Sequence, residues 1–263
     1  MELIDTHCHP VLLAERGVLD DAWERCSSNG VVQMLAVGLN LEDSCKNQEV
    51  AHSKPGVFFT VGWHPQEKQA PTTTEVEALD QLLADPRAMA VGEIGLDLFF
   101  RPGYHETGLE IQSQSFDAMM GLAKAHDKPV VIHARDAHDE ILDAMARWPD
   151  VRGVMHCFSG DIEFAKRCLG LGYVLSFSGI ATFKNAKDIR TVAQVVGGDE
   201  FMVETDSPFL APVPHRGEMN LPGFVKHTAQ GVADLRGEKL EDVAAATTAT
   251  ARRVFGLPSG DVL

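Results

Sequence analysis

The chain has 263 residues, of which 44% are hydrophobic and 23% are charged, the balance expected of a globular protein with a sizeable core. Its formal net charge of −15 at pH 7 argues against a broad electrostatic grip on duplex nucleic acid, which relies on clustered Lys and Arg. Its five cysteines form no CxxC pair, so we expect no disulfide framework. We find no signal peptide and no apolar stretch able to span a bilayer, and therefore expect a cytoplasmic protein that does not bind membranes.

Short apolar runs alternate with amphipathic segments along the chain. The apolar runs predict buried strands over Leu3–His7, Val31–Val37, Val57–Gly62, Met89–Ile94, Pro129–His133, Gly153–His156, Tyr173–Ser178 and Phe201–Glu204. The amphipathic segments predict helices over Glu42–Ser53, Thr74–Ala84, Leu109–His126, Asp136–Arg147, Ile162–Leu169, Asn185–Val196, Gly223–Leu235 and Leu240–Phe255. Asp161 and Asn185 are candidate caps at helix starts.

This order predicts an α/β fold, a (β/α)8 barrel formed by residues 1–263 as one domain. A doubly wound open sheet is the alternative architecture. It is the weaker one because the polar residues described next come from strands spread along the whole chain. Only a closed ring of strands would bring the two ends of the chain together.

Six side chains able to bind a metal ion end apolar runs, where a predicted strand gives way to a loop. They are His7, His9, Glu93, His133, His156 and Asp206. The carboxyl ends of barrel strands meet at one rim, so we expect these side chains to converge. A single strand-end histidine is more often structural, but repeated endings that carry only imidazole and carboxylate favour a metal centre. The other histidines, His105 among them, are expected to be mostly solvated.

Glu93 lies in an apolar run, where a lone carboxylate is costly to bury unless something compensates its charge. Bound cations would do so, and the two oxygens of Glu93 could bridge a pair of them. A structural ion pair with Arg101 or Arg135 is the alternative. Six ligands without Cys suit two divalent cations with open positions for water and substrate, rather than one structural zinc. Mg, Mn, Zn, Co and Ni all accept such ligands.

Four polar residues are candidates for roles beside the cations. Asp206 could also accept a proton from the attacking water. Glu204, two residues earlier, would orient a ligating histidine or that water, or else form an interior salt bridge. His64 and Arg135 are expected to face the substrate, and the planar fork of Arg135 suits phosphate oxygens unless it holds a carboxylate such as Asp136.

The motifs DTHCH, GWHP, GEIGLD, IHARD, HCFSG, LSFSGIATFKNA and ETDSPFLAP occur in this order. With them the chain resembles, over nearly its whole length, the TatD-family metal-dependent deoxyribonucleases of the amidohydrolase-like group. The resemblance implies a cytosolic (β/α)8 barrel with one or two divalent metals that hydrolyses DNA phosphodiester bonds, often as a 3'–5' exonuclease on single strands. It carries over the six residues above as metal ligands, with Glu93 as the bridge where many related barrels use a carboxylated Lys.

The chain departs from the family pattern at Asn220-Leu221-Pro222 and at Thr250, and the first departure leaves the substrate preference of the barrel mouth open. The leading hypothesis is a two-metal phosphodiesterase whose partner is single-stranded DNA, with no determinant of oligomeric state and a monomer expected. A metal-dependent hydrolase of a small amide, ester or lactone is the alternative. A third hypothesis, from another class, is a non-catalytic metal-binding protein.

Overall fold

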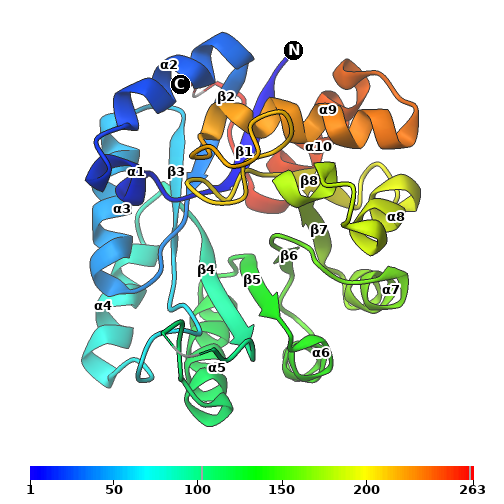
Figure 1. Cartoon of the computed structure of the whole chain (residues 1–263). Helices are drawn as coiled ribbons and strands as arrows, with labels where there is room; N and C mark the ends of the chain where they lie inside the picture. Colours follow the sequence, from blue (N-terminus) through cyan, green and yellow to red (C-terminus); the bar gives the residue numbers. More distant parts are fainter. Residues whose placement is uncertain (102, 261) are drawn as a thin grey trace.

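Eight parallel strands form one sheet in chain order, and helices surround it (Figure 1). The computed structural model describes residues 1–101, 103–260 and 262–263. Its strands are β1 Leu3–Cys8, β2 Val31–Ala36, β3 Val57–Val61, β4 Ala88–Asp97, β5 Val130–Arg135, β6 Gly153–Met155, β7 Val174–Phe177 and β8 Phe201–Val203. Each strand pairs in parallel with the next one along the chain, without the reversal of strand order that an open doubly wound sheet requires. The predicted (β/α)8 barrel is therefore confirmed.

The helices cover the outside of the sheet. They are α1 Pro10–Glu15, α2 Leu19–Asn29, α3 Leu41–Ser53, α4 Thr73–Leu83, α5 Leu109–Ala125, α6 His138–Ala146, α7 Ile162–Gly170, α8 Lys187–Val195, α9 Val225–Arg236 and α10 Leu240–Phe255, with short 3-10 turns η1 Gly179–Thr182 and η2 Pro222–Phe224. No helix in the described ranges is long and apolar enough to cross a membrane.

Two helices were not predicted, and one predicted cap is wrong. Helix α1 is only six residues long, too short to show a helical period. Helix α2 does carry Leu19, Ala22, Trp23 and Cys26 at helical spacing, so the sequence held a signal that the prediction missed. Asp161 caps α7 as predicted, accepting a hydrogen bond from the Phe164 amide at 2.9 Å. Asn185 does not cap α8, because that helix begins after Ala186 and has no side-chain cap.

Strand β4 continues to Asp97 instead of ending at the predicted Ile94. Its ladder with β5 extends to the pair Asp97 and Arg135, so backbone pairing persists past the apolar run. Glu93 consequently lies inside β4 and not at its end, which corrects the prediction for this residue. The strand end is occupied by a second carboxylate, Asp97.

The barrel closes between β1 and the segment that follows β8. Cys8 and Ser207 form a parallel bridge, and the His9 amide donates to the Ser207 carbonyl at 2.9 Å. The Asp206 amide donates to the His7 carbonyl at 2.8 Å. These backbone contacts bring the first and last polar strand endings of the chain side by side.

One buried layer fills the barrel beneath this closure. It contains one residue from every strand, namely Ile4, Leu35, Phe58, Ala90, Val131, Val154, Val174 and Met202. Phe255 from α10 packs against the same layer. Apolar side chains thus occupy the barrel floor, and the polar residues gather toward the carboxyl ends of the strands, where barrel active sites are built.

Candidate metal centre

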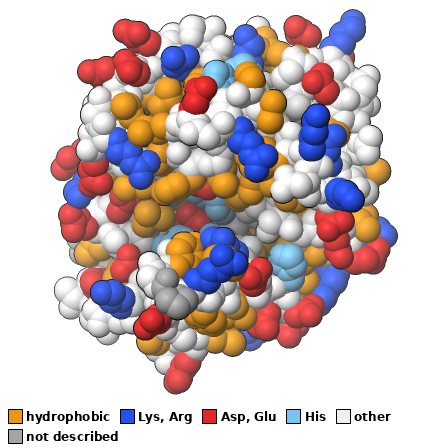
Figure 2. All heavy atoms as spheres, viewed as in Figure 1, with side chains coloured by type: hydrophobic (Ala, Val, Ile, Leu, Met, Phe, Trp, Pro, Cys, Tyr) orange, Lys and Arg blue, Asp and Glu red, His pale blue; other side chains and the backbone are white. Residues whose placement is uncertain are grey.

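The structure brings all six predicted ligands together, and His64 joins them. Their ligand-capable atoms lie within 4.8 Å of one another in three overlapping groups, which are His7, His9 and Glu93; His64, Glu93 and His133; and His7, His156 and Asp206. Figure 2 shows imidazole and acidic side chains at the floor of a hollow that is bordered by hydrophobic side chains and by Lys or Arg.

Glu93 lies at the centre of the cluster, and its two oxygens face different imidazoles. Oε2 lies 3.3 Å from Nε2 of His7. Oε1 lies 2.7 Å from Nδ1 of His133, 3.2 Å from Nε2 of His156 and 3.4 Å from Nε2 of His64. One carboxylate from β4 therefore separates two sets of potential ligands.

Asp206 stands on the His7 side of Glu93. Its Oδ1 lies 3.4 Å from Nε2 of His9 and 3.8 Å from Nε2 of His7. The side chain is 14% exposed, so it can reach a bound substrate as well as the cluster. Asp206 has a φ of 57°, in the left-handed region that costs roughly 1–2 kcal/mol for a residue with a Cβ. The hydrogen bond of its amide to β1 helps to hold this conformation.

Opposing charges shift the pKa values inside the cluster. Burial by itself raises the pKa of Glu93, but His156 and His64 outweigh burial and hold this pKa well below its usual range. Burial by itself lowers the pKa of His156, but Glu204 and Glu93 outweigh it and raise this pKa well above its ordinary value. Glu93 is therefore ionised and attracts positive charge to the centre, as a cation site requires.

His7 provides a direct test of whether the cluster fits a metal ion. Both of its ring nitrogens are buried without a hydrogen-bond partner among the described residues, because the contact with Glu93 lacks hydrogen-bond geometry. Burial and the nearby His156 lower the pKa of His7, which favours the neutral imidazole. A neutral imidazole with an unused lone pair is the form that binds divalent metals. The residues present therefore fit the predicted cations.

Glu204 lies behind His156. Its Oε1 lies 2.9 Å from Nδ1 of His156 and accepts a hydrogen bond from the Cys157 amide at 2.8 Å. The Glu204 side chain is 1% exposed, so it contacts the ring from the protein side and not from the solvent side. This is the position from which a carboxylate can fix the orientation of a ligating imidazole.

Asp97 and His105 extend the cluster beyond the residues predicted from the sequence. Asp97 Oδ2 lies 3.2 Å from Nε2 of His133 and accepts from the Gln66 side chain at 2.8 Å. Asp97 Oδ1 lies 3.3 Å from Nε2 of His105. His105 was expected to be solvated, but it is buried. The sequence signal for Asp97 is its place at the end of GEIGLD, which becomes a strand end only when β4 is extended.

The two residues predicted to face the substrate lie at the mouth of the cluster. His64 contacts Glu93 and is 14% exposed. Arg135 holds no carboxylate within ion-pair distance among the described residues, so its predicted alternative pairing is wrong. Its Nη1 donates instead to the Tyr104 hydroxyl at 2.7 Å, and its guanidinium lies 3.8 Å from the centroid of the Phe99 ring.

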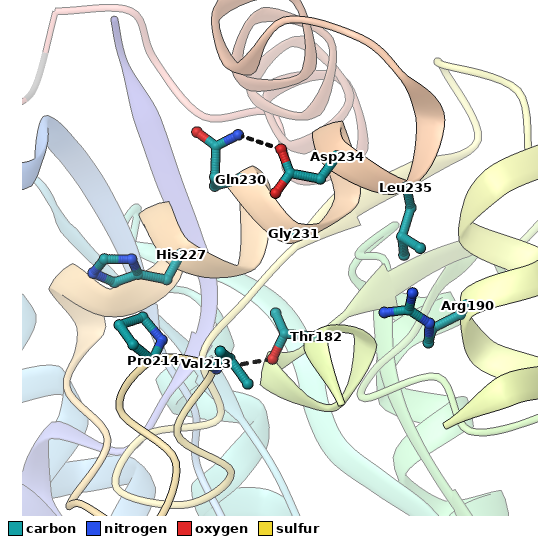
Figure 3. A pocket seen from close by; sticks show the side chains of 9 residues that line it. All are labelled: Thr182, Arg190, Val213, Pro214, His227, Gln230, Gly231, Asp234 and Leu235. Atoms are coloured by element: carbon teal, nitrogen blue, oxygen red, sulfur yellow. Dashed lines mark hydrogen bonds between the residues drawn. The ribbon is translucent and has the colours of Figure 1, made fainter. Parts of the chain in front are cut away.

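A second hollow, of about 360 Å³, lies away from the cluster between η1, α8, α9 and the loop before η2 (Figure 3). Its lining is Thr182, Arg190, Val213, Pro214, His227, Gln230, Gly231, Asp234 and Leu235. Gln230 and Asp234 bond to each other at 2.8 Å, and the Val213 amide donates to Thr182. None of the predicted site residues lines this hollow.

An eight-stranded barrel with an imidazole and carboxylate cluster at the carboxyl ends of its strands is the architecture of metal-dependent barrel hydrolases. Comparison with known proteins narrows this class. The family model "TatD related DNase" matches residues 4–256. The chain therefore belongs to the TatD-related DNase family, and it is a metal-dependent hydrolase.

Individual relatives support the assignment over the whole length. The uncharacterized metal-dependent hydrolase YcfH of Escherichia coli K12 is 37% identical over 260 residues, covering 97% of this chain and 96% of its own. The 3'-5' ssDNA/RNA exonuclease TatD of Erwinia billingiae is 33% identical over 248 residues, covering 91% and 94%. The crystal structure of YJJV, a TatD homolog from Escherichia coli K12, superposes with a TM-score of 0.89 at 28% identity, covering 97% and 98%.

Proposed function

We propose that the protein hydrolyses phosphodiester bonds of single-stranded DNA with two divalent cations held on either side of Glu93. The observation that carries this proposal is the division of the cluster by one carboxylate, whose Oε2 faces His7 while its Oε1 faces His133 and His156. A carboxylate with both oxygens directed at separate imidazole sets suits a bridge between two cations, the arrangement that clamps the attacking and leaving oxygens of a phosphoryl displacement.

The proposed ligands fall into two sets that share Glu93. His7, His9 and Asp206 would hold one cation, and His133 and His156 would hold the other. The imidazole and carboxylate donors accept Mg, Mn, Zn, Co or Ni. Bound divalent cations would neutralise phosphate charge and acidify the attacking water.

Side chains of the protein would carry out proton transfer, orientation of a ligand and phosphate binding. Asp206, ionised and partly exposed, would take the proton from the attacking water. Burial by itself raises the pKa of Asp206, but the hydrogen bond with His9 and the charges of His156, His7 and His9 together outweigh burial and lower this pKa. Asp206 is therefore ionised and has a free oxygen lone pair for a proton. Glu204 would hold the His156 ring in place, and His64 with Arg135 would bind the phosphate oxygens.

Nucleic acid is the preferred substrate because relatives at 33% and 31% identity bear the name 3'-5' ssDNA/RNA exonuclease. A net charge of −15 is compatible with a local grip on one unpaired strand at the cluster, but not with wide coverage of a duplex. We infer 3'–5' polarity from the same names. We further propose that residues 1–263 act as one domain and as a cytoplasmic monomer.

The test compares wild type with Glu93→Gln, which keeps the side-chain size and removes the charge. We expect wild type, loaded with each of the five metals in turn, to cleave single-stranded DNA and the small diester bis(p-nitrophenyl) phosphate. Glu93→Gln should lose both activities by roughly 100- to 1,000-fold, the scale of losing one preorganised electrostatic group of an active site. Glu163→Gln, an exposed change on α7, is the matched control and should keep full activity.

Hydrolysis of small amides, esters or lactones without cleavage of any phosphodiester would overturn the proposal in favour of the small-substrate alternative. Tight metal binding with no turnover of any substrate would favour a non-catalytic protein. Circular dichroism of each variant separates loss of activity from loss of fold.

A further inference from the structure

Among the described residues, the exposed Phe and Tyr side chains lie in loops that follow the carboxyl ends of barrel strands. Phe100 and Tyr104, in the loop after β4, are 51% and 43% exposed, and Phe209, in the loop after β8, is 45% exposed. The other aromatic side chains are buried or half-buried. Exposing a large ring to water has no packing benefit, so this concentration beside the metal centre indicates a binding surface.

Two arginines accompany the rings after β4. The Arg101 guanidinium lies 4.1 Å from the Phe99 ring centroid, and that of Arg135 lies 3.8 Å from it. Arg135 also lies 5.1 Å from the Tyr104 ring and donates to its hydroxyl. We call Phe99, Phe100, Arg101, Tyr104 and Arg135 the aromatic–arginine cluster.

The charges of this cluster are not neutralised by the protein. Neither Arg101 nor Arg135 has a carboxylate within ion-pair distance among the described residues, although the chain carries 38 acidic side chains against 23 basic ones. Two unpaired guanidiniums beside the mouth of an acidic protein would attract a polyanion locally. Each guanidinium is held in position by stacking on the Phe99 ring. Stacking uses no N–H donor, so donors of each arginine remain free to bind phosphate.

The loop that carries the rings is tied to the metal centre by several hydrogen bonds. The Phe99 amide donates to Asp97 Oδ1 at 3.0 Å, and the Leu98 amide donates to the Arg135 carbonyl at 2.9 Å. The Gln112 side chain donates to the carbonyls of Asp97 and Thr107 at 2.8 Å and 2.7 Å. The rings therefore have defined positions relative to the cluster of Glu93.

The position of Arg135 on β5 shows how far the aromatic–arginine cluster lies from the ligand cluster around Glu93. It lies two residues beyond His133 on β5, which corresponds to about 6.6 Å along a strand. A nucleotide next to a phosphate held at the metal centre would thus reach the rings with its base. Trp63, an aromatic residue just after β3, is 5% exposed and donates to the Gln69 carbonyl, so its ring is not available for stacking.

We infer that the aromatic–arginine cluster is a stacking platform for the unpaired base beside the scissile phosphate, with Tyr104 and Phe100 as the stacking rings. This inference rests on the proposed function and adds to it the part of the strand that the protein recognises. Stacking requires an open base face, so the platform selects single strands over duplexes. It accepts any base, because every base has a π face.

The test measures binding separately from turnover. Wild type, with its metal ions, is titrated with a phosphorothioate single strand that resists hydrolysis and carries 2-aminopurine. We expect fluorescence quenching on binding, and an affinity roughly 10-fold or more lower in Tyr104→Ala and in Phe100→Ala, the scale of one lost base stack. Tyr104→Phe keeps the ring and should retain the quenching. Val195→Ala, a change of an exposed apolar side chain on α8, should bind as wild type does.

A strand with abasic positions should bind weakly and equally to wild type and to Tyr104→Ala. The platform would be overturned if Tyr104→Ala lowered the affinity for the abasic strand as much as it lowers the affinity for the intact strand. Unchanged quenching in Tyr104→Ala would overturn it as well. Cleavage of phosphodiesters by a wild type that shows no quenching would reject the platform and leave the proposed function intact. Quenching by a wild type that cleaves no phosphodiester would keep the platform and reject the proposed function.

Discussion

Oε1 of Glu204 lies 2.9 Å from Nδ1 of His156, which leaves Nε2 of the same ring directed at Glu93. Glu204→Ala removes the acceptor that fixes this ring, so we expect divalent-metal affinity to fall roughly 10- to 100-fold. A competition titration against a fluorescent chelator measures the change. Glu163→Ala, an exposed change on α7, is the control. Unchanged metal affinity in Glu204→Ala would show that the contact with Glu204 is not needed to orient the His156 ring.

Asp97 touches both His133 and the loop of the aromatic–arginine cluster. Asp97→Asn keeps the shape and removes the charge, so His133 keeps Glu93 but loses the second of its two carboxylate partners, and the Phe99 amide loses a charged acceptor. We expect kcat on single-stranded DNA to fall roughly 10- to 100-fold, as for other residues that orient a ligand. Asp150→Asn, which changes an exposed partner of Lys124, should have no effect. A variant with normal kcat and only raised KM would limit Asp97 to supporting the loop.

Removal of the metal ions should lower thermal stability as well as activity. Without a cation, the nitrogens of His7 have no bonding partner and the negative charges of the neighbouring carboxylates are not compensated. A ligand at 100 times its Kd stabilises the folded state by about 2.7 kcal/mol, which corresponds to roughly 5–10 °C in Tm for a chain of this size. Differential scanning calorimetry before and after EDTA dialysis measures this shift, and readdition of metal should reverse it. A Tm that is insensitive to EDTA would contradict the proposed centre.

Asp85, between α4 and β4, is predicted to stabilise the fold in a pH-dependent way. Burial by itself raises its pKa, but hydrogen bonds from His52, the Arg87 amide and Gln48 outweigh burial and lower the pKa from its usual value of 3.8. A lowered pKa means that this stability is present above pH 3.8 and is lost as the pH falls through the lower, folded-state value.

We therefore expect Asp85→Asn to lower the free energy of unfolding by about 1 kcal/mol at pH 7, the usual contribution of such hydrogen bonds. The difference between wild type and variant should shrink as the pH falls below 3.8, where the wild-type carboxylate also becomes protonated. Urea titrations at several pH values measure this difference. A difference that stays constant down to acid pH would assign the effect to packing and not to charge.

Sequence patterns predicted all eight strands and eight of the ten α-helices of the described residues, but missed α1 and α2. Leu240–Phe255 was predicted as a helix with the bounds that α10 has, because its apolar face is long and regular. Helix α1 is too short to show a period, whereas α2 was missed although Leu19, Ala22, Trp23 and Cys26 stand at helical spacing. The predicted end of β4 at Ile94 was wrong because hydrogen bonding to β5 extends the strand past its apolar residues. Pairing between strands depends on both partners and cannot be predicted from one segment alone.

The candidate ligands were foreseen because a carboxylate or imidazole at the end of a buried run is conspicuous by its chemistry alone. His105 was misplaced for the opposite reason, since its loop carries no period and its burial comes from packing beside Asp97. The exposed rings of Phe100 and Tyr104 likewise gave no signal in the sequence, because exposure depends on what the rest of the chain covers.

The amino-acid sequence by itself determined the order of the eight strands and the chemical types of the ligands, since both follow from local hydrophobicity and side-chain chemistry. Tertiary structure alone decided which oxygen of Glu93 faces His7 and which faces His133, and that Asp97, His105 and the aromatic–arginine cluster adjoin them. The physical reason is that these distances depend on strand register and on closure of the barrel between β1 and the segment after β8, which join residues far apart in the chain.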